Sequence, residues 1–189
     1  QNNITKVLGN FTPKWTGGLT NTFTYKGITL DVLIDGRYGG DIYSMTTSWG
    51  RYSGVFEETL LGRETGIVGK GVIDNGDGTF RPNDVVVTAE QYNKGAYSND
   101  VAESSIFDGS FIKLRQLQLG YRLPNKIFGN LPFRDVTLSV VGRNLGLLYA
   151  TIPHVDPETA FSSDNGNQGL EFGQIPTNRS IGFNINFKL

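Results

Sequence analysis

The chain has 189 residues, about one domain by the usual relation between length and domain number. Its 17 basic and 18 acidic side chains give a net charge of -1, without the basic surplus that nucleic-acid binding requires. It has no cysteine, which excludes disulfides, thiolate metal sites and cysteine nucleophiles. The apolar runs are too short for a spanning helix, and residues 1–20 lack the apolar core of a signal peptide. The single methionine is Met45, so we expect that Gln1 is not a translation start and that the chain is cut from something longer.

Abundant glycine and 12% aromatic residues favour β-structure, and alternating apolar positions predict two strands near the start of the chain. We expect these strands over residues 11–25 and 28–43, joined by a tight turn at Lys26-Gly27. Their aligned apolar positions are Trp15, Leu19, Phe23, Tyr25, Ile28, Leu30, Val32, Ile34 and Tyr38. Both runs are longer than the strands of most soluble proteins.

A long connection follows over residues 44–110. We expect a short amphipathic helix over residues 55–63, and a turn rich in Asp, Asn and Gly over residues 74–79 between two short apolar runs. Trp49, Arg51 and Tyr52 lie near the start of this connection; aromatic rings suit stacking on sugars or peptides, and a guanidinium suits a carboxylate. We favour the other explanation of these residues, which is packing within the loop or docking of a partner protein, because aromatic side chains anchor interfaces as readily as ligands.

The third strand is expected over residues 111–123, where the alternation changes phase. Ile112 and Leu114 are apolar at even positions, whereas the apolar positions from Leu117 onward are odd. A β-bulge near Gln116 would join the two halves, because one extra residue reverses the phase. The other possibility is that the first half stands above a membrane, and the sequence leaves both open.

Two more strands are expected over residues 135–149 and 176–189, separated by a second long connection over residues 150–175. Short and long connections thus alternate, as in a transmembrane β-barrel with periplasmic turns and extracellular loops. Trp15 and Tyr25 are ten residues apart on one face, which at about 3.4 Å per residue and a tilt of about 40° spans roughly 26 Å, close to the apolar band of such barrels.

The predicted fold class is therefore all-β: an antiparallel transmembrane β-barrel segment of about five strands with long extracellular loops. The residues expected to face lipid are Trp15, Tyr25, Ile34, Tyr38, Tyr121, Ile181, Phe183, Ile185 and Phe187. The charged residues expected to face the lumen are Asp31, Asp35, Arg37 and Arg143. We interpret these charges mainly as pairs within the barrel wall, with contact to a plug or a passing substrate as the alternative.

No residue pattern supports catalysis or a cofactor. The acidic turn at residues 74–79 has Gly76 where a calcium ligand would be needed, so it is interpreted as an Asx turn, and no metal site is predicted. His154 has no nucleophile nearby, and Asp156 and Glu158 on either side of a proline are interpreted as structural. We therefore predict that the chain is not an enzyme and needs no cofactor.

Four segments in order carry a family resemblance: SFIKLRQLQLGYRLP (110–124), VVGRNLGLLY (140–149), HVDPE (154–158) and IPTNRSIGFNINFKL (175–189). With residues 10–43 before them, they resemble the C-terminal end of SusC/RagA-type TonB-dependent outer-membrane transporters. The resemblance implies the last five strands of a large barrel, with 22 strands and a plug domain that this chain lacks. It also implies an outer-membrane location and energy supplied through TonB.

The same resemblance implies import of glycan or peptide fragments. The implied partners are a SusD-like surface lipoprotein, the TonB complex through the missing N-terminal part, the rest of the barrel, and the lipid and lipopolysaccharide of the outer membrane. Two alternatives stay open. One is a barrel that does not transport, such as an adhesin or an assembly anchor, and the other is a soluble carbohydrate-binding β-sandwich, whose strands also alternate.

Overall fold

The computed structural model describes residues 6–98, 101–129, 131–159, 161 and 164–188. The chain forms two compact units, and each is described by itself. One, here called the sheet unit, comprises residues 10–41, 108–159 and 175–189. The other, here called the loop unit, comprises residues 1–9, 42–107 and 160–174.

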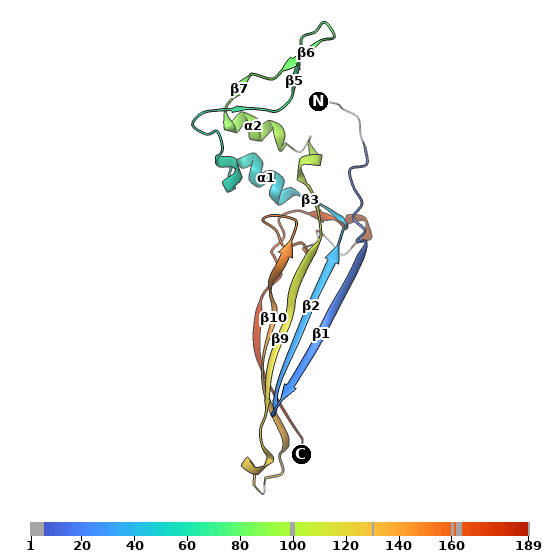
Figure 1. Cartoon of the computed structure of the whole chain (residues 1–189), viewed down its shortest axis with the longest axis vertical. Coiled ribbons are helices and arrows are strands. Elements are labelled where there is room, and N and C mark those ends of the chain that lie inside the picture. The colour runs from blue at the N-terminus through green and yellow to red at the C-terminus, as the bar shows by residue number, and fades with distance from the viewer. Residues whose placement is uncertain (1–5, 99–100, 130, 160, 162–163, 189) are drawn as a thin grey trace. The chain divides into compact units, whose positions relative to one another are not determined.

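The sheet unit contains one five-stranded antiparallel sheet in the order β1-β2-β9-β10-β12 (Figure 1). Its strands are β1 (Trp15–Tyr25), β2 (Ile28–Tyr38), β9 (Phe111–Arg122), β10 (Arg134–Ala150) and β12 (Ser180–Lys188). The all-β, antiparallel fold class predicted from the sequence is confirmed. The outermost strands begin four residues later than expected, at Trp15 and Ser180, and the part of the last strand that falls on Leu189 lies outside the described residues.

A two-residue turn joins β1 to β2. Lys26 has φ 47° and Gly27 has φ 85°, so both turn residues are left-handed, as in the tight hairpin turns that match strand twist. Tyr25 pairs with Ile28, and the register runs without interruption to Trp15 opposite Tyr38. The turn therefore fixes which residues of the two strands share a face.

β2 ends at Tyr38, and the expectation that this strand continues to residue 43 is wrong. Gly39 (φ 73°) and Gly40 (φ 85°) are both left-handed, which interrupts the strand. The chain then forms β3 (Asp41–Ser44), which belongs to a different sheet, of order β11-β3-β8. Two adjacent glycines at the end of an alternating run were the signal for this break.

β9 contains a bulge at Arg115. Gln116 pairs with Leu33 and Leu114 pairs with Ile34, so Arg115 is the extra residue. The register against β10 also shifts at this point, but there the extra residue is on β10: Gln116 is opposite Arg143 and Leu114 is opposite Gly146, so Arg115 faces two residues of β10. Of the two explanations that the sequence left open, the structure therefore has the bulge, and Leu114 returns to the face that carries Leu117.

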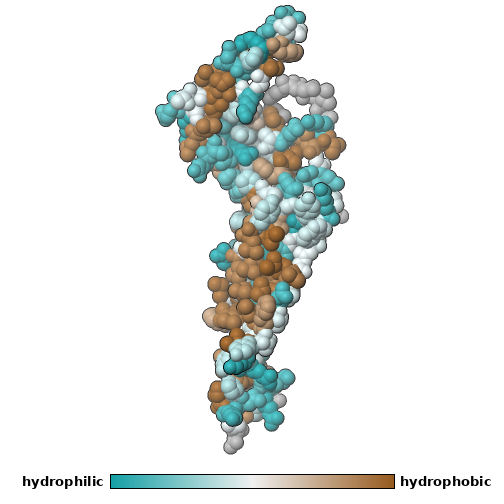
Figure 2. All heavy atoms as spheres, viewed as in Figure 1, coloured by the Kyte–Doolittle hydropathy of each residue, from teal (hydrophilic) through white to brown (hydrophobic). Residues whose placement is uncertain are grey.

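Apolar side chains of the five strands align across the sheet on one face. One row consists of Phe23, Leu30, Leu119, Val140 and Phe183, which are opposite one another in register. The next row toward the β1–β2 turn consists of Tyr25, Ile28, Tyr121, Leu138 and Ile185. Figure 2 shows these strands as a continuous hydrophobic surface.

These apolar side chains are exposed, since Phe183 is 82% and Ile181 is 70% accessible. The buried apolar residues among those described are Ile42, Ala89, Phe111, Val136 and Ile152. The long strands therefore contribute almost nothing to a protein core, although their sequences are strongly apolar.

Short elements and two helices make up the loop unit, together with β3 and β8 at its junctions with the sheet unit. They are α1 (Met45–Ser53), η1 (Glu57–Leu60), β4 (Ile67–Val68), β5 (Val72–Asp74), β6 (Phe80–Pro82), β7 (Val86–Val87), α2 (Ala89–Ala96), η2 (Ala102–Ser105), β8 (Ile106–Asp108), η4 (Asn165–Asn167) and β11 (Leu170–Glu171). Helices α1 and α2 pack against each other, and β4 pairs with β7 while β5 pairs with β6. None of the helices in the described part of the chain is long and apolar enough to cross a membrane.

The prediction of a helix over residues 55–63 is wrong, because the helix in this region, α1, ends before that segment. Ser44 caps α1 by accepting the backbone N–H of Thr47 at 3.1 Å, and Gly54 ends it in a left-handed conformation. Residues 57–60 form only a 3-10 turn. The apolar pattern of residues 55–63 suited a helix, but Gly54 separates it from the capped start at Ser44.

Candidate functional site

The four charged residues predicted to face a lumen lie on the face of the sheet opposite the apolar rows. Asp31 is opposite Thr22 and Gln118. Asp35 is opposite Gly18 and Lys113. Arg37 is opposite Thr16 and Phe111, and Arg143 is opposite Gln116 and Ser180.

A buried ionic network forms around Lys113 on this polar face. The Lys113 Nζ lies 2.6 Å from Glu158 Oε2 and 3.2 Å from Asp156 Oδ2, and it donates to Thr177 Oγ1 at 2.9 Å. The Lys113 side chain is only 3% exposed. One lysine from β9 thus holds two carboxylates and a hydroxyl from the long connection between β10 and β12.

Arg115, the bulge residue, extends the network to Asp35. Its Nη2 lies 2.6 Å from Asp35 Oδ2, and its Nη1 donates to Glu158 Oε2 at 2.9 Å. A second contact to Glu158 makes that pair bidentate, the geometry for which arginine is best suited. The bulge places Arg115 beside Gln116 instead of on the opposite face, and so brings β2, β9 and the connection after β10 into one network.

The two carboxylates of the connection are ionised within this network. Burial by itself raises the pKa of Asp156, but hydrogen bonds from Thr177 and from the Glu158 backbone, and the charge of Lys113, hold it below its ordinary value. For Glu158, burial also raises the pKa, and contacts with Arg115 and Lys113 outweigh that effect. An ionised pair of this kind fixes a loop; it does not provide the carboxylic acid that general acid catalysis needs.

An open hollow of about 420 Å³ lies beside this network in the sheet unit. Lys113, Asp156 and Thr177 form part of its wall, together with His154 and Arg179. His154 has φ 64°, in the left-handed region that few residues other than glycine adopt and in which histidine, asparagine and aspartate are the most frequent exceptions. Residues 154–156 of the HVDPE segment thus form part of the wall of a charged hollow on the polar face.

The other predicted lumen charges make separate contacts. Asp31 accepts a hydrogen bond from Thr22 Oγ1 at 2.6 Å, and Arg37 donates to the backbone oxygens of Gly39 and Phe11 at 3.0 and 2.9 Å. Arg143 is exposed. The structure therefore brings only Asp35 of the four predicted charges into the network.

Sequence reasoning missed the other four charged members of the network that contains Asp35. Lys113 and Arg115 were left unplaced because the phase of their strand was unresolved, and Asp156 and Glu158 were interpreted only as structural. The change of phase in this strand was the one signal for two neighbouring cations on the polar face, and it does not show which carboxylates they meet there.

The three loop candidates lie on or beside α1 and are engaged to different degrees. Arg51 donates to Glu58 at 3.1 Å and to the Ser104 backbone at 3.3 Å, and its guanidinium lies over the rings of Tyr97 and Phe107. It therefore holds the loop unit together.

Trp49 and Tyr52 are more exposed, at 57% and 41%. Tyr52 lines a hollow of about 730 Å³ in the loop unit that also contains Thr59, Arg63, Asn93 and Lys94. The loop unit therefore offers an aromatic ring beside several polar side chains.

A buried carboxylate that the sequence did not single out closes the loop unit. Glu171 is 1% exposed and accepts hydrogen bonds from Ser44 Oγ and Thr46 Oγ1, both at 2.6 Å, and from the Gly173 backbone at 2.7 Å. It lies at the start of α1, where a negative charge is favoured. Glu171 therefore holds its own segment of the loop unit against the start of α1, which is more than 120 residues earlier in the chain.

The acidic turn between β5 and β6 is an Asx turn, as predicted. Asp74 accepts the backbone N–H of Gly76 and Asp77 accepts that of Thr79, both at 2.8 Å. The apolar run after this turn does not pair with β5: residues 80–82 take that place, and Val86–Val87 pairs with β4.

The chain is similar to two curated proteins over nearly its whole length. TonB-dependent receptor P3 of Formosa agariphila is 27% identical over 188 residues, covering 97% of this chain and 17% of that protein. TonB-dependent receptor P26 of the same organism is 25% identical over 195 residues, covering 96% of this chain and 18% of that protein. The predicted resemblance is confirmed. This chain spans less than a fifth of the length of the TonB-dependent receptors that it matches, and no family model matches it.

Solved structures agree on the fold. A chain of the RagAB peptide transporter aligns with a TM-score of 0.57 and 18% identity over 90% of this chain and 16% of that one. A chain of the RagAB peptide importer in the open-open state aligns with a TM-score of 0.57 and 19% identity over 98% of this chain and 18% of that one. At this identity the likeness concerns the fold, which is mostly antiparallel β-sheet in this chain.

Proposed function

We propose that this chain is part of an outer-membrane active transporter, with its sheet in the barrel wall. The observation that carries the proposal is the exposed apolar face of the sheet. Burying one large apolar side chain stabilises a protein by about 2 kcal/mol, so leaving roughly ten of them in water forgoes about 20 kcal/mol. That exceeds the whole stability of a typical domain, about 5–15 kcal/mol, whereas lipid would cover this face at no such cost.

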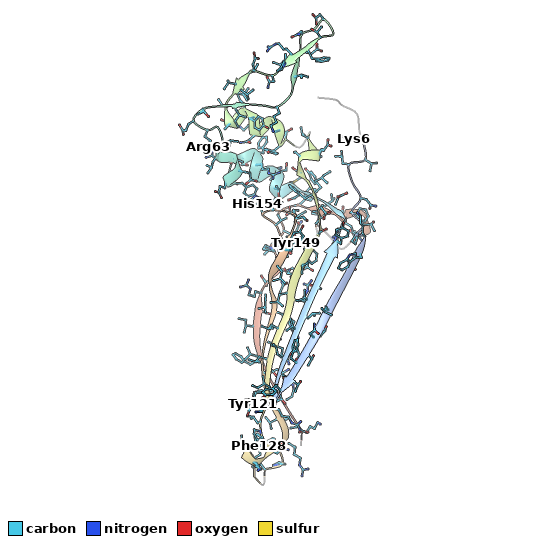
Figure 3. All side chains as sticks on the ribbon, in the orientation of Figure 1. Lys6, Arg63, Tyr121, Phe128, Tyr149 and His154 are labelled. Atoms are coloured by element: carbon cyan, nitrogen blue, oxygen red, sulfur yellow. The ribbon has the colours of Figure 1, made fainter. Side chains whose placement is uncertain are left out.

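Aromatic residues border the apolar face at both ends, as at the two interfaces of a membrane. Trp15 and Tyr38 are opposite each other at one end, and Tyr25, Ile28 and Tyr121 form a row at the other. Figure 3 shows Tyr121 and Tyr149 at opposite ends of the sheet. Aromatic side chains favour the water–lipid boundary, so we place the two membrane interfaces at these rows.

The free edges of β1 and β12 support closure into a larger barrel. Among the described residues, each edge strand has a neighbour on one side only, and an unpaired backbone edge is not tolerated in lipid. We therefore propose that β1 and β12 pair with further strands, and that the polar face with Asp31, Asp35 and Arg143 lines the interior. Trp15, Ile34, Phe183 and the other predicted apolar positions then face lipid.

The transport activity is inferred from the relatives. Proteins similar to this chain are named TonB-dependent receptors, and proteins of like fold belong to a peptide transporter. We propose import of glycan or peptide fragments, energised through TonB and assisted by a surface lipoprotein. In this proposal the loop unit faces the outside, and Trp49 and Tyr52 contact the substrate or the lipoprotein.

The decisive experiment uses the intact protein in its own cell. Deleting the gene should abolish uptake of one labelled class, oligosaccharides or oligopeptides, and uptake should also stop when the proton gradient is collapsed. Normal uptake of both classes with loss of surface adhesion would support a barrel that does not transport. Recovery of the intact protein in the soluble fraction, without detergent, would contradict the membrane assignment itself.

A further inference from the structure

One end of the sheet carries a surplus of positive charge. This region, here called the basic end, comprises residues 25–29, 121–136 and 186–188, which hold both short turns of the sheet unit. Its charged side chains are Lys26, Arg122, Lys126, Arg134, Asp135 and Lys188. Five of them are basic and one is acidic. Since the whole chain has 17 basic and 18 acidic side chains, 12 basic and 17 acidic side chains lie elsewhere. The basic end therefore has a charge of +4, and the rest of the chain has a charge of -5.

Internal pairing leaves most of this charge uncompensated. Asp135 is shared by Arg122 and by Lys188, whose Nζ lies 3.3 Å from Oδ2, so one carboxylate serves two cations. Both cations remain well exposed, at 60% and 76%. Among the described residues, Lys126 and Arg134 have no ion pair, and Lys26 lies 5.2 Å from the centre of the Tyr25 ring.

Exposed apolar side chains accompany the cations. Ile127, at the end of η3 (Asn125–Ile127), is 64% exposed, and Leu131 is 60% exposed. The rings of Phe133 and Phe187 meet edge to face with centroids 5.5 Å apart, next to the aromatic row of Tyr121. The apolar face of the sheet thus continues into a turn where apolar and basic side chains alternate, as Figure 2 shows beyond the hydrophobic surface.

We propose that the basic end binds the phosphate headgroups of anionic phospholipids in the membrane leaflet that it enters. This inference rests on the proposed membrane location. A phosphate supplies the negative charge that Lys26, Lys126 and Arg134 do not find in an ion pair among the described residues. Acyl chains suit the exposed side chains of Ile127 and Leu131. A lipid meets both requirements at once because its headgroup lies directly above the apolar layer. Continuity with the lipid-facing rows favours a lipid over a soluble acidic protein.

The test compares the intact protein in nanodiscs of phosphatidylethanolamine with and without phosphatidylglycerol. The variant Lys26→Gln/Lys126→Gln/Arg134→Gln removes three cations without touching the Asp135 pairs. The matched control, Lys6→Gln/Lys70→Gln/Arg81→Gln, removes three exposed cations from the loop unit. Native mass spectrometry counts the phosphatidylglycerol molecules that stay bound, and a titration gives their affinity.

We expect the wild type and the control to retain phosphatidylglycerol selectively, and affinity to fall about five-fold for each cation removed, equivalent to about 1 kcal/mol. Raised salt should weaken the selectivity of the wild type, because exposed charges are screened. Equal retention by wild type and triple variant would overturn the inference, as would salt-sensitive binding to peptidoglycan without any preference for phosphatidylglycerol. If the protein inserts into both nanodiscs without selectivity, only this inference fails; if it enters neither, the proposed membrane location fails as well.

Discussion

Lys113 is the residue on which the ionic network depends. Replacing it with methionine, which matches its length, leaves Asp156 and Glu158 without their shared cation. Removing one partner of a buried ion pair typically costs about 3–5 kcal/mol, so we expect a large fall in stability and faster proteolysis of residues 151–177. Thermal unfolding and limited proteolysis of the intact protein would measure both effects.

The control for this substitution is Lys94→Met in the loop unit. Lys94 also contacts a carboxylate, that of Glu90 at 2.7 Å, but the two side chains are 48% and 72% exposed. Exposed pairs contribute about 0–1 kcal/mol, so this variant should be close to wild type. Equal effects from Lys94→Met and Lys113→Met would show that the network contributes no special stability.

Acid should release the same network. The folded-state pKa values of Asp156 and Glu158 lie below their ordinary values of 3.8 and 4.5. Stability from a lowered carboxyl pKa is complete above the unfolded value and is lost as the pH falls through the folded one. We therefore expect the 151–177 connection to become protease-sensitive below about pH 4. The Asp156→Asn/Glu158→Gln variant should be sensitive already at neutral pH and show a weaker pH dependence in this range.

At the scale of the element, the bulge at Arg115 sets the phase of β9. Deleting Arg115 would reverse the faces of residues 111–114 and turn Lys113 toward the apolar side. We expect this deletion to abolish assembly of the intact protein, measured as loss of the fast-migrating folded form on unheated gels. Deleting Gly78 in the open β5–β6 turn also removes one residue and should leave assembly intact.

β12 offers a matched test of the two faces. Ile181 lies about midway between the aromatic rows on the apolar face, and Asn184 lies on the opposite face of the same strand. Arginine near the middle of a membrane costs about 2–4 kcal/mol on a lipid-facing position, whereas an interior position tolerates it. We expect Ile181→Arg to impair folding into liposomes and Asn184→Arg to fold normally. The reverse order would assign the two faces the other way.

The sequence determined the sheet more completely than the polar network. Strict alternation, as in Ile181 to Phe187, predicts both the strand and the residues that share each face, because a period of two has one structural meaning in a long run. The network was not predictable, because it joins Asp35, Lys113 and Glu158 from three distant segments and depends on one inserted residue. The α1 helix was misplaced because its cap at Ser44 and its stop at Gly54 carry more information than the apolar pattern after them.

At the scale of the whole molecule, the exposed apolar face predicts how the chain behaves alone. We expect the isolated 189-residue chain to aggregate in water and to remain dispersed only in detergent, because its long strands bury few apolar residues. Sedimentation with and without detergent measures this directly. A soluble monomer with one cooperative unfolding transition would instead favour a β-sandwich that carries its own core.

The contact between Ser44 and Glu171 has a consequence for the order of events during synthesis. These residues are 127 positions apart, and both β9 and β10 lie between them in the chain. A chain made from its N-terminus therefore completes α1 long before its capping partner exists. The loop unit can close only after two further strands have been made, so it is among the last parts of this chain to reach its final form.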